Sequence, residues 1–239
     1  MNIFDWTEIS RSPVSQEVHV ALLQQVLRRT KTPITHYPEF LASFVENRIV
    51  LDIGSVEHDL DHARSPSWRH ALLKRHAKEI TGLDILEHET EILRNLGFNI
   101  LCADATSDID LKVRVERVVI GDVIEHVDSA VDLLKFARRH LLPNGVICVT
   151  TPNPFFWRHF LRILHEQTFV SNAEHISWVS PSMAIELARR SNLQLTSIHH
   201  LRPSVTRISR RLKRFIADRL FGKQSEFLTS SFVYLFERR

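Results

Sequence analysis

The chain has 239 residues, of which 44% are hydrophobic, so it is long enough and apolar enough to bury the core of one domain. Its formal net charge of +3 is too small to indicate a nucleic-acid-binding protein by itself. The sequence has no stretch approaching the roughly 18 consecutive apolar residues of a membrane span and no signal peptide, which predicts a cytoplasmic protein.

The first part of the chain has the apolar spacing of α-helices. From about residue 15 to residue 47, apolar side chains recur every three or four positions around Pro33 and Pro38. This spacing predicts two helices that precede the main sheet. We interpret residues 1–47 as an N-terminal helical lid and residues 48–239 as the main domain.

Short β-branched runs then alternate with helical stretches. Strands are predicted at residues 48–53, 79–84, 99–103, 117–121 and 146–150. Helices are predicted at residues 67–77, 87–96 and 128–141, and a Leu-Pro-Asn-Gly turn at 142–145 ends the last of them. Alternation of this kind is typical of a parallel, doubly wound sheet of the α/β class.

The last part of the chain departs from this alternation. A helix at 181–191 is followed by a strand near 193–200, a basic segment at 202–223 and a final strand near 227–236. The two strands predict a closing antiparallel hairpin that carries a basic amphipathic insertion. The predicted fold is a doubly wound, seven-stranded, mostly parallel Rossmann-like sheet with an antiparallel final strand.

The two cysteines lie in two of the predicted strands. Cys102 and Cys148 each belong to a short apolar run, which predicts that both thiols are buried. We interpret them as packing residues rather than as a disulfide pair, as expected in a reducing compartment.

Acidic residues accompany the ends of the first three predicted strands. Ligands of doubly wound sheets bind beyond the carboxyl ends of the strands, so these residues can meet at one site. Gly54 lets the backbone pass close to a ligand, and Asp52 offers a carboxylate to a sulfonium cation. Asp84 suits ribose hydroxyls, and Asp104 suits the amine of adenine, although each carboxylate could instead cap the next helix. The predicted cofactor-binding set is Asp52, Gly54, Ser55, Asp84, Ile85, Asp104, Ala105 and Gly121.

Several segments together resemble class I S-adenosylmethionine-dependent methyltransferases, in order from about residue 48 to residue 200. They are Val-Leu-Asp-Ile-Gly at 50–54, Gly-Leu-Asp at 82–84, Gly-Asp-Val-Ile-Glu-His-Val at 121–127, Leu-Pro-Asn-Gly at 142–145 and Thr-Pro-Asn-Pro at 151–154. The resemblance implies S-adenosylmethionine, and not NAD, as the cofactor. Residues 124–126 and 151–153 also resemble the branch that holds ubiquinone-type O-methyltransferases and bacterial glycan-modifying methyltransferases.

The first loop departs from the family pattern in two ways. Val56 and His58 stand where the family usually has its second and third glycines, so the loop must follow a bulkier path. The spacing from Asp52 to Asp84 also exceeds the roughly 20 residues of a dinucleotide site. An insertion around residues 59–68 would account for this longer spacing.

A second group of candidate residues follows the fourth predicted strand. Asp122, Glu125 and His126 have the spacing i, i+3, i+4 and can share one face of a turn or helix. The family resemblance places the segment with His175 over the acceptor side of the same pocket. Together the four side chains suit Mg²⁺, Mn²⁺ or Zn²⁺, which would lower the pKa of an acceptor hydroxyl. This set resembles that of metal-assisted small-RNA 2′-O-methyltransferases.

Two metal-free interpretations of these residues stay open. In the first, His126 is a general base oriented by a carboxylate, and His175 binds or shapes the substrate. In the second, Glu125 and His126 only cap the following helix, and His175 is a surface residue. We take His126, Glu125 and His175 as the predicted catalytic residues.

The basic segment at 202–223 combines arginines and lysines with apolar residues at helical spacing. Such a helix can lie in the interface of an anionic membrane, which predicts peripheral contact with the inner face of a membrane. The alternative is an ordinary amphipathic helix packed on the domain. Few aromatic residues interleave with the charges, so nucleic acid is not an expected partner.

The sequence therefore predicts an O-methyltransferase that acts on a sugar hydroxyl of a glycan, glycolipid or polysaccharide precursor. One alternative is a methyltransferase of a prenylated quinone or small phenol, whose hydroxyl is more acidic than that of a sugar. Another is a catalytically weak binding or scaffold domain, suggested by the glycines missing at positions 56 and 58. An NAD-dependent enzyme is disfavoured because the first turn lacks spaced glycines.

Overall fold

The protein is described by a computed structural model over residues 4–57, 60–63, 65, 67–202, 218–222 and 225–238. These residues form one seven-stranded sheet in the order β3-β2-β1-β4-β5-β7-β6. β1 to β5 run parallel, and β7 lies antiparallel between β5 and β6. The strands are β1 (Ile49–Ile53), β2 (Glu79–Asp84), β3 (Ile100–Cys102), β4 (Val115–Gly121), β5 (Leu141–Pro152), β6 (Leu193–Leu201) and β7 (Ser231–Arg238). This arrangement confirms the predicted fold class.

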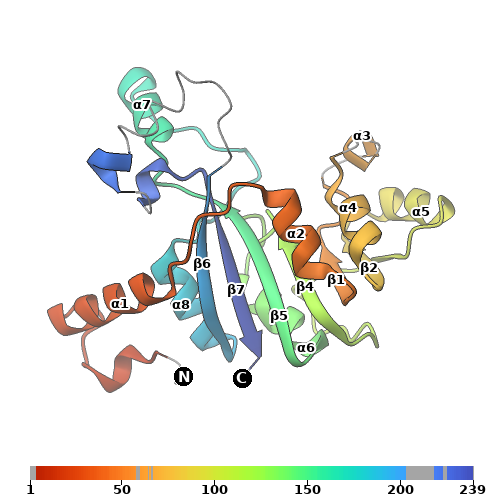
Figure 1. Ribbon diagram of the computed structural model, residues 1–239, viewed down its shortest axis with the longest axis horizontal. Coiled ribbons are helices and arrows are strands. Elements are labelled where there is room, and N and C mark those ends of the chain that lie inside the picture. The colour runs from red at the N-terminus through yellow and green to blue at the C-terminus, as the bar shows by residue number, and fades with distance from the viewer. Residues whose placement is uncertain are drawn as a thin grey trace.

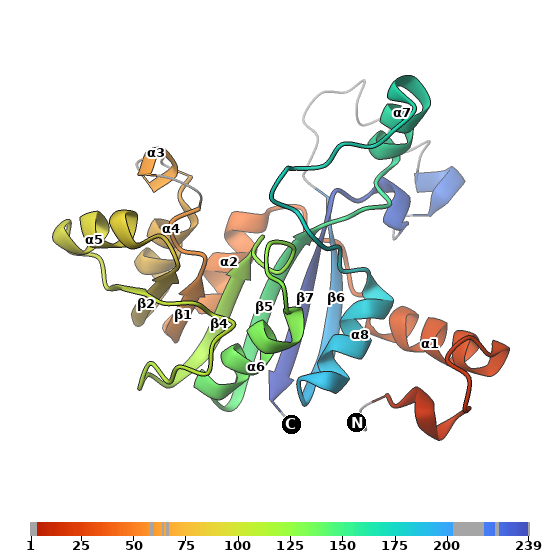
Figure 2. The same ribbon diagram turned by 180° about the vertical axis from the view of Figure 1, so that it is seen from behind.

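Helices cover both faces of the sheet (Figure 1). α2 (Tyr37–Val45) and α4 (Arg69–His76) pack together on one face, and α6 (Ala130–His140) and α8 (Pro181–Arg190) cover the other, as Figure 2 shows from behind. α1 (Gln16–Arg29) contacts α8 and β6, and α5 (Glu87–Asn95) packs on β3. The remaining helices are η1 (Trp6–Glu8), α3 (Leu60–Ala63), α7 (Trp157–Glu166) and η2 (Glu226–Leu228).

Alternate residues of the central strands point into two different hydrophobic clusters. In β4, Val118 and Ile120 pack with Phe136 of α6, whereas Val119 packs in the cluster that contains Leu73 of α4. This period of two is that of a strand buried on both faces, as is usual for a parallel sheet covered by helices. The polar groups of a binding site can therefore gather only where the strands end.

The predicted burial of the two cysteines is confirmed for one of them and wrong for the other. Cys148 of β5 is buried in the core, as predicted, in one cluster with Val119 and Val233 of the neighbouring strands β4 and β7. Cys102 is exposed, so the prediction of burial was wrong there. The reason is its position at the end of β3, a three-residue strand at the edge of the sheet that has a neighbour on one side only.

Two other segments differ from the prediction, and a third lies mostly outside the residues that the structure describes. The predicted turn at 142–145 falls inside β5, which begins at Leu141, although Asn144 keeps the positive φ of 64° that suits a turn. The helix α7 was not predicted. Most of the basic segment at 202–223 lies outside the described residues, which include only Arg202 and residues 218–222 of it. Among the described helices, none is long and apolar enough to cross a bilayer.

Candidate active site

A cavity of about 710 Å³ lies at the carboxyl ends of the central strands. Six of the eight predicted cofactor-binding residues line it, namely Gly54, Asp84, Ile85, Asp104, Ala105 and Gly121. The other two, Asp52 and Ser55, are completely buried behind it. Of the predicted lid residues, Tyr37 lines the cavity and its hydroxyl lies 2.7 Å from Oγ1 of Thr150.

One end of the cavity is bounded by the ends of β2 and β3. Asp84 accepts three backbone hydrogen bonds, from Val56 at 2.8 Å, Ile85 at 2.9 Å and Leu86 at 3.3 Å, and so holds the first loop against β2. Asp104 accepts hydrogen bonds from the backbone and hydroxyl of Thr106, both at 2.7 Å. Each carboxylate therefore stabilises a local turn and also lines the cavity. Because a carboxylate can accept about four hydrogen bonds, both retain acceptor capacity for a ligand.

The first loop passes the cavity with glycine at its closest point. Gly54 has a φ of 76°, and a Cβ at this position would clash with the side chain of Val123. Val56, which replaces a glycine of the family pattern, is completely buried and packs with Trp68 and Ile100. Its bulk is therefore accommodated in the core and not in the cavity. His58 lies outside the described residues.

The inner wall of the cavity contains an ionic group that the sequence did not predict. Asp52 of β1 receives Nε of Arg69 at 3.1 Å on one carboxylate oxygen and faces Nδ1 of His70 at 2.9 Å on the other. Burial alone would raise the pKa of Asp52, but the guanidinium and the imidazole hold it below its usual value. The carboxylate thus points into this group and does not line the cavity.

Arg69 also reaches the backbone at the ends of two strands. Its Nη2 donates to the carbonyl of Gly54 at 2.6 Å, and its Nη1 donates to the carbonyl of Gly121 at 3.2 Å. Glu57 lies 3.3 Å from Nη1. Burial would lower the pKa of Arg69, but Asp52 and Glu57 raise it, so this side chain stays charged inside the wall.

Three of the four predicted metal or catalytic residues lie together at the opposite side of the cavity, where His126 lines it and Glu125 and His175 do not. Glu125, His126 and His175 each offer a ligand atom, and these atoms lie within 4.8 Å of one another. Asp122 is outside this group; it lines the cavity with a positive φ of 51°. The backbone of Ile176 donates to the carbonyl of Glu125 at 3.0 Å, which fixes the segment with His175 beside the turn of His126.

Glu125 is the most buried member of this cluster. Its Oε2 accepts a hydrogen bond from Thr151 at 3.2 Å, whereas its Oε1 is buried without a hydrogen-bond partner among the described residues. Burial and the nearby charge of Asp122 raise the pKa of Glu125 to about 7. The capping interpretation of this segment is wrong, because Ser129 caps α6 by accepting from the backbone of Asp132 at 3.1 Å.

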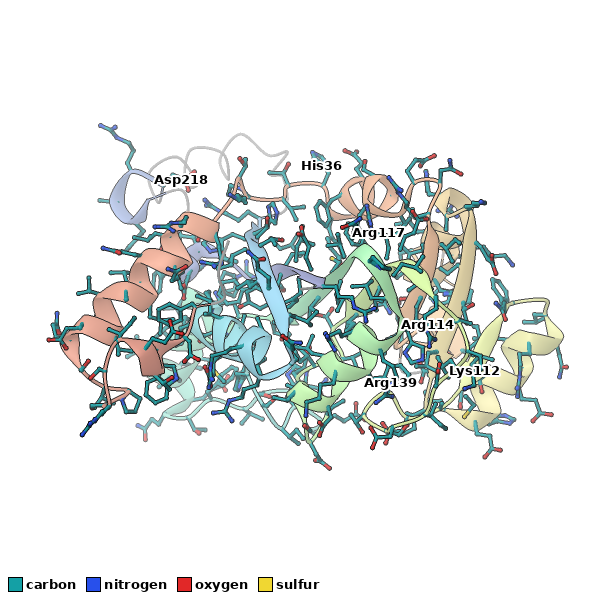
Figure 3. All side chains as sticks on the ribbon, turned by 90° about the horizontal axis from the view of Figure 1, so that it is seen from below. His36, Lys112, Arg114, Arg117, Arg139 and Asp218 are labelled. Carbon is teal, nitrogen blue, oxygen red and sulfur yellow. The ribbon has the colours of Figure 1, made fainter. Side chains whose placement is uncertain are left out.

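A separate group of basic side chains lies at the other end of the sheet. Figure 3 shows Lys112, Arg114 and Arg139 near one another, before β4 and on α6. Arg114 and Arg139 each lie 2.9 Å from a carboxylate, that of Asp110 and of Asp108 respectively. These cations are paired on the surface and take no part in the cavity.

Comparison with known proteins gives one family and many similar structures. A family model described as a methyltransferase domain matches residues 26–198. An S-adenosylmethionine-dependent methyltransferase from Archaeoglobus fulgidus is 17% identical, covers 91% of this chain and 99% of its own, and has a TM-score of 0.55. One from Mesorhizobium loti is 13% identical, with coverages of 84% and 96% and a TM-score of 0.54. These two likenesses show the fold, and a comparison with curated protein sequences finds no match.

The raised pKa of Glu125 predicts a pH-dependent loss of stability. The folded chain holds this proton up to a pKa of about 7, whereas an unfolded glutamate releases it near a pKa of about 4.3. The stabilisation is fully present below about pH 4 and is lost as the pH rises through about 7. Between about pH 5 and about pH 8, we expect the wild-type chain to lose about 2 kcal/mol of unfolding free energy relative to Glu125→Gln.

Urea denaturation across this pH range measures the difference. Glu91→Gln, at an exposed glutamate of α5, serves as the control and should retain the wild-type pH dependence. Parallel pH profiles for wild type and Glu125→Gln would contradict the prediction.

Proposed function

The chain belongs to the methyltransferase domain family and is an S-adenosylmethionine-dependent methyltransferase, and from this premise we propose that it methylates a sugar hydroxyl of a glycan, glycolipid or polysaccharide precursor. The observation that carries the proposal is the cluster of Glu125, His126 and His175 at the cavity. A sugar hydroxyl must lose its proton during transfer, and this cluster offers groups that can take it. The likeness in fold does not by itself select an acceptor.

The residues of the cavity fit the adenosine part of the cofactor. The volume of about 710 Å³ is within the range of small-molecule sites. Carboxylates of Asp84 and Asp104 suit hydroxyl and amine donors, and Leu83 and Leu86 offer apolar surface between them. When bound, S-adenosylmethionine supplies an electrophilic methyl group. The chain must then hold the acceptor in line with that group and remove the acceptor proton.

We assign proton removal to His126. Its side chain is 20% exposed, and its Nδ1 lies 3.9 Å from the carboxylate of Glu174. His175 lies edge-on to His126 with ring centroids 4.8 Å apart, so it can shape the place where the acceptor hydroxyl binds. Glu125, which is buried and uncharged below its pKa of about 7, orients the cluster from behind.

The same three residues could hold a divalent metal ion. One carboxylate oxygen and two imidazole nitrogens leave coordination positions open, as catalytic metal sites do. An ion held there would bind the acceptor oxygen and lower its pKa. This is the second form of the proposal, and it differs from the first in its dependence on metal.

The exposed face of α7 favours an acceptor that carries a lipid. Leu161 and Leu164 are 52% and 79% exposed, and no residue of α7 is buried. Arg158 and Arg162 lie on the same helix, and α7 projects away from the sheet (Figure 1). Exposed apolar and basic residues on one helix suit the surface of an anionic membrane. A glycolipid or a prenylated quinone, the alternative acceptor, would be presented there.

Acceptor profiling tests the proposed substrate class. The full chain would be incubated with methyl-labelled S-adenosylmethionine and either saccharides and glycolipids or prenylated catechols. We expect kcat/KM for a saccharide or glycolipid to exceed that for the catechols by about tenfold or more, because the site must accept polar hydroxyl groups. Transfer to catechols alone would favour the phenol alternative and contradict the proposal.

Replacing His126 tests its role in proton removal, and chelation with EDTA distinguishes the base from the metal form. We expect His126→Ala to lower kcat by about 100-fold with unchanged binding of S-adenosylhomocysteine, because the variant lacks the proton acceptor. His88→Ala, at an exposed histidine of α5, should keep wild-type turnover. Activity should also survive EDTA. Loss of activity in EDTA, with recovery on adding Mg²⁺, Mn²⁺ or Zn²⁺, would instead support the metal form.

Vesicle binding tests the role of α7. Leu164→Asp should weaken co-sedimentation with phosphatidylglycerol vesicles by about tenfold, because a leucine side chain contributes roughly 2 kcal/mol when buried in lipid. Leu96→Asp, at a leucine that is 67% exposed beside α5, is the matched control and should bind as wild type does. Equal binding of both variants would exclude α7 as the contact.

A further inference from the structure

The inner end of the cavity contains a cation that belongs to the protein itself. The side chain of Arg69 is 10% exposed and lines the cavity between the ends of β1 and β4. A Cβ on Gly121 would clash with its guanidinium, so the glycine lets Arg69 lie directly on the backbone. Arg69 is the first residue of α4, so only the residues that follow it belong to the helix.

The hydrogen-bonding capacity of this guanidinium is filled from within the chain. An arginine has five N–H donors. Those of Arg69 make four hydrogen bonds, to the carboxylate of Asp52 and to the carbonyls of Ile53, Gly54 and Gly121, and its Nη1 also forms an ion pair with the carboxylate of Glu57 at 3.3 Å. The number of acceptors equals the number of donors. In this arrangement Arg69 therefore has no donor directed at a ligand carboxylate.

The same acceptors are those that the other end of the cofactor needs. S-adenosylmethionine carries an amino-acid group whose ammonium has three N–H donors, as a lysine side chain does. At the inner end of the cavity, the carbonyls of Gly54 and Gly121 and the carboxylate of Glu57 can accept them. A second cation on acceptors already bonded to Arg69 would be repelled by the guanidinium.

From this competition, and on the premise of the proposed function, we propose that Arg69 substitutes internally for the ammonium group of the cofactor. It must leave the carbonyls of Gly54 and Gly121 before the amino-acid end of S-adenosylmethionine can bind. The adenosine end, at Asp84 and Asp104, is free of this competition. Arg69 thus lowers affinity for ligands with an amino-acid group and leaves affinity for adenosine-type ligands unchanged.

Two nucleoside ligands separate these effects. S-adenosylhomocysteine carries the amino-acid group, and 5′-methylthioadenosine lacks it. Isothermal titration would measure both on wild type, Arg69→Gln and the control Arg75→Gln, which removes an exposed arginine of the same helix. We expect Arg69→Gln to bind S-adenosylhomocysteine about tenfold more tightly. In the wild type, part of the binding free energy is needed to move Arg69 away from the carbonyls of Gly54 and Gly121, and the variant does not have this cost. Binding of 5′-methylthioadenosine should stay within about twofold in every variant.

Arg69→Lys keeps the test decisive if Arg69→Gln does not fold. A lysine retains a positive charge beside Asp52, but its compact ammonium cannot bond both carbonyls as the planar guanidinium does. It should also tighten binding of S-adenosylhomocysteine, and circular dichroism would verify that it is folded. Weaker or unchanged binding of S-adenosylhomocysteine in the folded variants, with 5′-methylthioadenosine still bound, would overturn the role of Arg69. If neither S-adenosylhomocysteine nor 5′-methylthioadenosine binds wild type or any variant, the cofactor assignment itself is overturned, and the role of Arg69 with it.

Discussion

A carboxylate with no exposure to solvent, that of Asp52, sits next to the last residue of β1. Burying such a charge without partners would cost several kcal/mol, so its two oxygens must be satisfied from within the protein. Arg69 and His70, consecutive residues at the start of α4, supply both partners. This pairing holds α4 against the ends of the central strands and builds the inner wall of the cavity. The course of the first loop and the position of Gly54 follow from it.

The fold was predictable from the sequence to a greater extent than the site. Alternation of β-branched runs and helical stretches predicted the first five strands, because a strand buried on both faces leaves a local apolar signal. The two strands after the helix at 181–191 were predicted separately, as a closing antiparallel hairpin. Glu125 and His126 were found by their spacing, and His175 by family resemblance. Arg69 gave no such signal, since its partner Asp52 lies 17 residues earlier and their contact depends on the path of the loop between them. α7 was missed because it contributes no buried residue to the core.

The acceptor side of the site depends on the segment that connects α7 with α8. Backbone N–H groups of Ile176 and Ser177 donate to the carbonyl of Glu125, and Tyr234 of β7 donates to the carbonyl of Val179. The segment is therefore held directly after His175, at Ile176 and Ser177, and again at Val179, on both sides of Trp178.

The place of β7 in the sheet has a consequence for how the protein is made. β7 is the last strand in the chain but lies between β5 and β6, with hydrogen bonds to both. While the ribosome is still synthesising residues 231–238, β5 and β6 each present an unpaired edge, and such edges promote aggregation. The sheet can close only after these residues have emerged. Pairing of β6 with the rest of the sheet therefore depends on β7.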